Sequence, residues 1–334
     1  MTYPQKPRDS PPSFWLHFTA GGLAGTVGAA VTCPLEVVKT RLQSSLYSSP
    51  VSAPVSARNP AKFVWSHMRG VVSILSDIYA REGLRALWKG LGPNLVGVVP
   101  ARSIHFAVYT QSKHYLSHAL KGESSVVHML SAAGASATTT FITNPIWLVK
   151  TRMQLQRAAE STTAAPRYRN AFHCVYEIVR TEGVTALYKG YTASLLGLGE
   201  SAMQFVVYEA LKRKVWLVQT TADPHSFWHR PAEGYKTGAA ELFACASLAK
   251  LFATLCTYPH EVLRTRLRQT PDADGRVKYH GIVQASRLML KEEGVAAFYG
   301  GMTAHVMRVV PNAAMLFLSY ESIVWYCRKY EIFA

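Results

Sequence analysis

The chain contains three six-residue stretches that begin with proline and end with a base: Pro34-Leu35-Glu36-Val37-Val38-Lys39, Pro145-Ile146-Trp147-Leu148-Val149-Lys150 and Pro259-His260-Glu261-Val262-Leu263-Arg264. The prolines are spaced by 111 and 114 residues, so a unit of about a hundred residues occurs three times. Each hexad ends a long apolar stretch, and Thr-Arg follows it as Thr40-Arg41, Thr151-Arg152 and Thr265-Arg266. A proline with charged residues at the end of an apolar helix predicts kinked helices that are joined by ion pairs.

The composition indicates a membrane protein. Apolar residues make up 49% of the 334 residues and charged residues only 17%. Two windows of 26 residues, Ser10 to Leu35 and Ser124 to Val149, contain no Asp, Glu, Lys or Arg, and roughly 20 such residues span a bilayer. Both windows are rich in small residues, which favours close helix packing. We therefore predict a polytopic membrane protein whose repeats form one structural domain.

The net charge of +16 would suggest nucleic-acid binding in a soluble protein. In a membrane protein it indicates either a positive-inside bias of the loops or a water-filled cavity that attracts anions, and both can hold. The five cysteines form no CxxC pair and no zinc spacing, so we expect them to be reduced. The histidines His17, His105 and His128 are isolated, and we expect no metal site.

Each repeat has the same order of segments. An apolar helix ends at the hexad, and a polar loop, a short amphipathic segment, a glycine turn and a second apolar helix follow. We assign residues 1–12 to an N-terminal tail without a leader pattern, and 13–120, 121–220 and 221–334 to the repeats, with a Ser/Pro/Ala-rich loop insertion at 44–69. The second helices are expected from about Asn94 to Leu116, Ser194 to Trp216 and Ala304 to Trp325. Two apolar helices in each of three repeats predict six membrane spans, which place both termini on the same side of the membrane.

The glycine turns read Trp88-Lys89-Gly90, Tyr188-Lys189-Gly190 and Tyr299-Gly300-Gly301. With these turns and the three hexads, the chain resembles the mitochondrial carrier family over nearly its whole length. The resemblance implies an all-α membrane protein of six tilted transmembrane helices in three pseudo-threefold repeats, with three short matrix helices. It also implies a multi-pass protein of the inner mitochondrial membrane that works by alternating access.

Within the family, the likeness is greatest to the pyrimidine nucleotide carriers. It rests on three stretches, Gly92 to Arg102, Pro145 to Gln154 and Tyr258 to Gln269. Trp147, which departs from the acid found in the other hexads, is shared with carriers of NAD, folate and FAD. A carrier of that type therefore remains an alternative. An alternative of another class is a basic helical-repeat adaptor or nucleic-acid binder, which the charge-free windows disfavour.

By position, the resemblance implies a matrix gate made of Glu36, Lys39, Lys150, Glu261, Arg264, Gln43 and Gln154. Glu36 would pair with Lys150 and Glu261 with Lys39, whereas Arg264 would face Trp147 instead of an acid. Gln43 and Gln154 match the family's bracing glutamines, and Arg268 occupies the third such place. The alternative is that these charges only solvate helix ends.

The opposite, cytoplasmic gate is predicted to be weaker. The family pattern places an acid after an aromatic residue and a base three residues later, and the chain retains Lys113, Glu209, Lys212 and Glu321. The family's pairing order leaves only Glu321 with Lys113 intact.

Counting back from the acid position of each second helix places three levels on one face. The levels are Gly97, Ala101, His105; Leu196, Glu200, Gln204; and Arg308, Asn312, Leu316. Arg102 lies next to this face. Arg308 and Arg102 are candidate phosphate ligands, since guanidinium binds phosphate oxygens in a bidentate way; interhelical ion pairs are the alternative. Gly97 and Gly197 would leave room for a base and ribose, and Gln204 and Asn312 could read a base edge or serve as core polar residues.

Lys250 lies in the middle of an apolar segment, nine residues before Pro259. An ammonium group there is costly without a function, so we expect it to contact substrate phosphates or to pair with Glu200; the alternative is a lysine that only extends toward the water of the cavity. At the membrane surface, Lys89-Gly90 and Lys189-Gly190 match the places where the family binds cardiolipin. The third turn has Gly300 in place of the base.

These observations together predict a carrier that exchanges pyrimidine nucleotides across the mitochondrial inner membrane. We expect it to be a monomer that needs no cofactor and binds no nucleic acid. The chain contains no P-loop and no nucleophile elbow, so we expect no enzyme activity.

Overall fold

Long apolar segments form long helices in the computed structural model, which describes residues 14–46, 60–120, 122, 124–156, 168–220, 239–271 and 277–329. All regular structure in these residues is helical. Each of the five longest helices contains a proline in its interior. They are α1 (Phe14–Gln43), α3 (Leu91–Ala119), α4 (Ser125–Leu155), α8 (Ala239–Leu267) and α10 (Met302–Lys329). At about 1.5 Å per residue, each exceeds the roughly 30 Å of a bilayer's hydrocarbon core.

The second helix of the second repeat is broken. It consists of α6 (Tyr191–Leu196) and α7 (Leu198–Thr220), and Gly197 lies between them. At the break, the amides of Gly197 and Glu200 bond to carbonyls only three residues earlier, at 3.1 and 3.2 Å. Glu209 follows Gly190 by 19 residues, whereas Thr110 and Glu321 follow Gly90 and Gly301 by 20. The expected helix from Ser194 to Trp216 is therefore interrupted where the repeat is one residue shorter.

Three amphipathic helices follow the first helix of each repeat, namely α2 (Pro60–Glu82), α5 (Ala171–Glu182) and α9 (Ile282–Glu292). A single 3₁₀ turn follows each of them, at Leu84–Trp88, Val184–Tyr188 and Val295–Tyr299. The Asn170 side chain caps α5 by accepting from the His173 amide at 2.8 Å. In the first two repeats the apolar face packs under the hexad helix: Ile78 is buried with Val37 and Val38, and Ile178 with Leu148.

The predicted loop insertion at 44–69 is too long, because residues 60–69 form the first turns of α2. A proline at the first helical position and good helix formers after it explain this start. The N-terminal tail and most of the loop before Pro60 lie outside the described residues.

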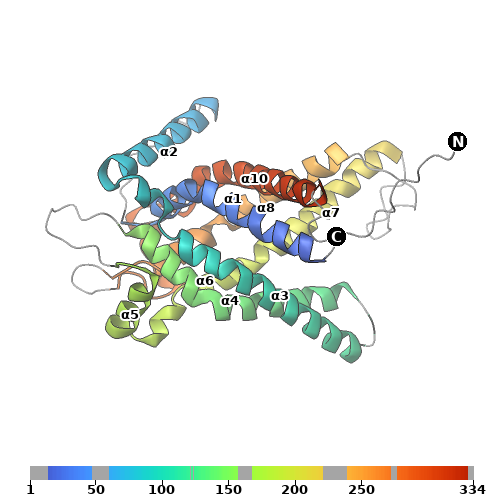
Figure 1. The fold of residues 1–334 in the computed structure, drawn as a ribbon, viewed down its shortest axis with the longest axis horizontal. Helices are drawn as coiled ribbons and strands as arrows, with labels where there is room; N and C mark the ends of the chain where they lie inside the picture. The colour runs from blue at the N-terminus through green and yellow to red at the C-terminus, as the bar shows by residue number, and fades with distance from the viewer. Residues whose placement is uncertain are drawn as a thin grey trace. The chain divides into compact units, whose positions relative to one another are not determined.

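The structure divides into two compact units, and the expectation that the three repeats form one structural domain stays a prediction. The first unit comprises Met1–Ser103, Pro145–Leu187 and Gly300–Ala334, and the second comprises Ile104–Asn144 and Tyr188–Tyr299. In the first unit α1 packs along α10, and in the second α7 packs along α8 (Figure 1). Two of the boundaries fall within α3 and α4, so these long helices contribute to both units, and the other two fall at the 3₁₀ turns that end at Tyr188 and Tyr299.

Of the helices in the described part of the chain, one segment, Glu241–Leu267, combines the length and the hydropathy of a bilayer-spanning helix. The other long helices carry many Gly, Ala, Ser and Thr residues, which lower their mean hydropathy. Small residues of this kind are typical of helices that pack closely against one another.

Candidate functional site

The arginine that follows each hexad is buried and forms an ion pair with the glutamate that ends the amphipathic helix or directly follows it. The pairs are Arg41–Glu82, Arg152–Glu182 and Arg266–Glu293. Each is bidentate, and the Nη2–Oε2 distances are 2.8, 2.8 and 2.6 Å. Sequence reasoning did not predict that these arginines and glutamates bind each other. Their recurrence was the signal that could have found the pairs, because each repeat has the arginine two residues after the hexad base and the glutamate directly before a glycine.

The turn that follows each glutamate is tied to the first helix of its own repeat through an aromatic residue. The Trp88 indole N–H donates to the Ala30 carbonyl at 2.9 Å. Tyr188 stacks on Phe141 with ring centroids 4.8 Å apart, and Tyr299 stacks on Tyr258 at 6.3 Å. These contacts fix the position at which the second helix of each repeat begins.

The glycine of each turn contacts the first helix of another repeat. A Cβ at Gly90 would lie 3.1 Å from the Lys150 carbonyl oxygen, and one at Gly190 would lie 3.2 Å from that of Arg264. A Cβ at Gly301 would lie 2.8 Å from the Lys39 carbonyl oxygen. All three glycines have positive φ, from 77° to 83°. These positions therefore need glycine both for conformation and for close approach.

Two cations surround the acid of the first hexad. Lys150 Nζ lies 2.7 Å from Glu36 Oε1 and 2.8 Å from Asn94 Oδ1, so the pair expected from the family pattern is present. Arg308 Nη1 lies 3.3 Å from the same Glu36 oxygen, which is the interhelical alternative that we left open for this arginine. Lys150 also lies over the Trp147 ring, 5.2 Å from its centroid. The candidate substrate arginine and the candidate gate therefore share one carboxylate.

The third hexad is organised differently. Arg264 Nη2 donates to Glu261 of its own helix at 2.8 Å. Glu261 and Lys39 belong to different units, so their pairing stays a prediction.

The three bracing positions that follow the hexads are buried. Gln154 Oε1 accepts from the Thr40 hydroxyl at 2.8 Å, and Gln43 is buried against Gly301. Arg268, at the place of the third glutamine, is buried as well. A guanidinium group therefore occupies an interior position that holds a neutral amide in the other two repeats.

Lys250 on α8 pairs with Glu200 on α7, with Nζ 2.7 Å from Oε1. The Thr254 hydroxyl, one turn further along α8, donates to the same oxygen at 3.1 Å. Lys250 remains 44% exposed, whereas Glu200 is 18% exposed. The ammonium group is thus held by a carboxylate and stays accessible from one side.

The polar candidates of the predicted substrate site have varied surroundings. Arg102 is exposed on α3, and Gln204 and His105 are half-buried. The Thr32 hydroxyl lies 3.4 Å from the Asn312 amide oxygen. A role for these side chains in holding a nucleotide stays a prediction.

The two glycines of the predicted substrate site lie against neighbouring helices. A Cβ at Gly97 would lie 3.0 Å from Ile146 and 3.3 Å from Trp147, and one at Gly197 would lie 2.8 Å from the His260 ring. Side chains of adjacent helices therefore already fill the space beside both glycines. That either glycine leaves room for a base and ribose stays a prediction.

At the opposite ends of the helices, the cytoplasmic-gate candidates include one ion pair within a helix. Lys212 Nζ lies 3.9 Å from Glu209 Oε1 within α7. The side chain of Glu321 lies outside the described residues, so its pairing with Lys113 stays a prediction. In the second unit, the Tyr109 hydroxyl is 2.9 Å from His128 Nδ1 and joins α3 to α4.

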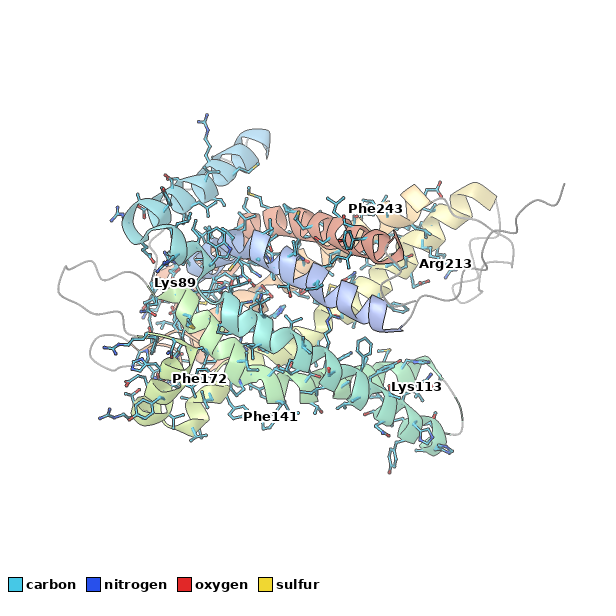
Figure 2. The ribbon with its side chains drawn as sticks, in the orientation of Figure 1. Lys89, Lys113, Phe141, Phe172, Arg213 and Phe243 are labelled. Carbon is cyan, nitrogen blue, oxygen red and sulfur yellow. The ribbon has the colours of Figure 1, made fainter. Side chains whose placement is uncertain are left out.

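The predicted lipid-binding positions lie on the glycine turns. Lys89, labelled in Figure 2, lies on the turn between α2 and α3. Its Nζ donates to Glu82 at 2.7 Å and to the Gln156 carbonyl at 2.9 Å. Gly90 and Gly190 directly precede α3 and α6, and Lys189 is the base of the second turn. The amide groups at the start of a helix have the polarity that suits an anionic headgroup.

Two of these ion pairs shift the pKa values of their acids. Burial alone would raise the pKa of Glu82, but hydrogen bonds from Arg41 and Lys89 hold it below the usual value. Hydrogen bonds from Arg266 lower the pKa of Glu293, against the opposing effect of burial. Both groups are therefore carboxylates at neutral pH.

Comparisons with known proteins agree with this triplicate construction. The family model of the mitochondrial carrier protein matches residues 10–120, 121–218 and 235–331. The chain is 41% identical to the mitochondrial pyrimidine nucleotide transporter RIM2 of Saccharomyces cerevisiae, over 93% of this chain and 85% of the relative. It is 43% identical to the mitochondrial carrier protein rim2 of Schizosaccharomyces pombe, over 92% and 88%. It is 41% identical to solute carrier family 25 member 36 of Mus musculus, over 93% and 96%. The chain therefore belongs to the mitochondrial carrier protein family.

Proposed function

We propose that this protein carries pyrimidine nucleotides across the mitochondrial inner membrane by exchange, and that it opens to one side of the membrane at a time. The single observation that supports the substrate most strongly is the 41% identity, over 93% of the chain, to a transporter named for pyrimidine nucleotides. The six spans of the carrier fold would be formed by α1, α3, α4, the α6–α7 pair, α8 and α10. Members of this family are transporters, so no catalytic step is required.

The nucleotide phosphates would bind Arg308, Lys250 and Arg102. Two of these cations already hold carboxylates, since Arg308 is 3.3 Å from Glu36 and Lys250 is 2.7 Å from Glu200. A phosphate group presents several anionic oxygens and competes with a single carboxylate for the same donors. Binding of the substrate would therefore exchange these internal pairs for phosphate contacts, which limits the cost of removing a charge from water.

The matrix gate would be the cluster of Glu36, Lys150 and Asn94, together with the predicted Glu261–Lys39 pair. An ion pair at about 4 Å is worth about 4 kcal/mol at an effective dielectric of about 20, before desolvation is subtracted. A shift of a two-state equilibrium from 1:99 to 99:1 takes about 5.5 kcal/mol. One or two such pairs are therefore of the size needed to control opening. Because Arg308 also contacts Glu36, phosphate binding at Arg308 would weaken this cluster directly.

The cytoplasmic gate would contain Glu321, Lys113, Glu209 and Lys212. With a single conventional pair, it would close less firmly than the matrix gate. Cardiolipin would bind at the Lys89-Gly90 and Lys189-Gly190 turns, where a base adjoins a helix start, and the protein would act as a monomer.

Uptake into liposomes tests the substrate. Purified protein would be reconstituted with unlabelled UTP inside and offered labelled UTP, CTP, dTTP, ATP, NAD, FAD and folate. We expect exchange of pyrimidine nucleotides and little uptake of the others. Uptake of NAD, FAD or folate in their place would favour the carriers that share Trp147, and uptake of none would contradict transport of this class.

Lys250→Ala tests the proposed phosphate ligand. Removal of the ammonium group leaves Glu200 as an unpaired carboxylate where an anion must bind, so we expect uptake of labelled UTP to be lost. The matched control is Lys278→Ala, which removes a lysine that pairs with Glu292 at 2.7 Å on the surface. Both variants should still insert into the liposome membrane. Undiminished transport by Lys250→Ala would contradict this role.

A further inference from the structure

The three turn glycines identify equivalent positions at the three junctions between repeats. Gly90 contacts Gln154, Gly301 contacts Gln43, and Gly190 contacts Arg268. Two junctions therefore place a neutral glutamine under the turn, and the junction between the second and third repeats places a guanidinium group there. All of the residues at that junction belong to the second unit.

The guanidinium group of Arg268 binds two elements of the second repeat. Its Nη2 donates to Asn144 Oδ1 on α4 at 2.7 Å and to the Ser194 hydroxyl on α6 at 3.1 Å. Asn144 Nδ2 in turn lies 3.5 Å from the Lys189 carbonyl. Arg268 is 5% exposed and Asn144 is 0% exposed. A residue that directly follows α8 is thereby joined to both membrane helices of the preceding repeat.

The junction between the first and second repeats shows what Arg268 replaces. There the hexad base Lys150 donates to Glu36 and to Asn94, which lies four residues after Gly90. Ser194 lies four residues after Gly190 and is the equivalent acceptor, whereas Trp147 occupies the place of Glu36. The equivalent base, Arg264, is bonded to Glu261 of its own helix.

We infer that Arg268 is a positioning residue that holds the second and third repeats together at the hexad end, in place of the acid–base pair that Trp147 removes. The inference rests on the proposed alternating access, because opening at this end must separate α8 from α4 and α6. Hydrogen bonds from a charged donor are stronger than those between neutral groups. Their loss should shift the unliganded carrier toward the state that is open at the hexad end.

Transport kinetics test this inference with the variants Arg268→Ala, Arg268→Gln, Asn144→Ala and the Arg268→Ala/Asn144→Ala double variant. Apparent KM and Vmax for labelled UTP would be measured from each side of liposomes whose carriers have one known orientation. We expect Arg268→Ala to lower the apparent KM at the hexad end and to raise it at the other end, each by about threefold or more. Arg268→Gln, which restores the glutamine of the other junctions, should recover part of the change.

Asn144→Ala should shift the two KM values in the same directions. The double variant should shift them no further than Arg268→Ala does, because Arg268→Ala already removes the hydrogen bond that Asn144 accepts. A purely structural role would lower Vmax and the unfolding temperature and leave both KM values unchanged. Unchanged KM values in Arg268→Ala, or additive shifts in the double variant, would overturn the inference.

Hydrogen exchange of the purified protein tests the same inference without any transported substrate. We expect Arg268→Ala to speed amide exchange by about tenfold or more in residues 190–196 and 264–271, because local opening exposes those amides. Residues 39–43 and 90–96, from junctions that keep their glutamines, should exchange as in the wild type. If Arg268→Ala changed the exchange rate by the same factor in all four segments, or in none of them, the role of Arg268 would be refuted. Absence of UTP transport by the wild type would count against the proposed function instead.

Discussion

At the scale of single residues, the arginine after each hexad is the most heavily constrained charge. Arg152 is 0% exposed and its partner Glu182 is 8% exposed, whereas the Arg81–Asp77 pair on α2 is 71% and 57% exposed. A buried ion pair adds little net stability when compared with apolar residues, but removal of one partner leaves an uncompensated charge. The three pairs therefore secure the amphipathic helices beneath the hexads.

Arg152→Ala should lower the free energy of unfolding by about 3–5 kcal/mol, because it strands the Glu182 carboxylate. The control Arg81→Ala removes a guanidinium group from an exposed pair and should change the free energy by about 0–1 kcal/mol. Unfolding in detergent, followed by fluorescence, measures both. Similar losses in the two variants would show that burial does not determine the effect.

Acid should also destabilise the protein through these pairs. The folded-state pKa values of Glu82 and Glu293 are lowered, so the unfolded chain binds more protons than the folded chain as the pH falls below the unfolded value of about 4.3. The contribution of these two carboxylates to stability is complete above that pH, and it is lost as the pH falls through their folded-state pKa values. We expect the unfolding temperature to drop in this range. Glu293→Gln should unfold at a lower temperature at pH 7 and lose less on acidification, and an equal acid response of this variant and the wild type would contradict the role of Glu293.

At the scale of elements, the turn glycines decide how one repeat meets the next. Gly301 and Gly294 both have φ of 77°, but their surroundings differ. A Cβ at Gly301 would lie 2.8 Å from the Lys39 carbonyl, whereas a Cβ at Gly294 would meet nothing within 4 Å. Comparing the two positions separates the cost of a left-handed conformation from the cost of lost contact between helices.

Gly301→Ala should therefore destabilise the protein more than Gly294→Ala does. Both variants carry the conformational penalty of about 1–2 kcal/mol for an L-residue at positive φ, and only Gly301→Ala must also move α10 away from α1. The unfolding temperatures of the two purified variants measure the difference. Equal decreases in the two unfolding temperatures would mean that the turn at Gly301 can move away from α1 without loss of stability.

At the scale of the whole molecule, the net charge of +16 should attract nucleotides before they bind. A rise in salt from about 0.01 M to about 0.1 M shortens the Debye length from about 30 Å to about 10 Å. We expect the apparent KM for a triphosphate to rise severalfold over this range, and that for the matching monophosphate to rise less. Initial rates of uptake in liposomes measure both KM values. An equal rise of the two KM values with salt would argue against electrostatic attraction.

The repeat and the family of this protein could be predicted from its sequence because the same pattern of proline and charged residues occurs three times. The spacing of Pro34, Pro145 and Pro259 indicated the repeat, and the family assignment confirms the carrier class. A pairing of Lys250 with Glu200 was one of the predicted alternatives, and the two side chains do form an ion pair. This prediction succeeded because a charged side chain within an apolar segment must either face a water-filled cavity or pair with an opposite charge.

Only the tertiary structure decided which partner each charge takes. It joined Arg41 to Glu82 across a loop, set Arg308 beside the carboxylate that Lys150 holds, and interrupted the second repeat at Gly197. Sequence spacing limits the face of a helix on which a residue lies, whereas an ion pair depends on distances of a few ångströms between helices. Those distances are determined by packing around small residues, and a linear pattern does not contain them.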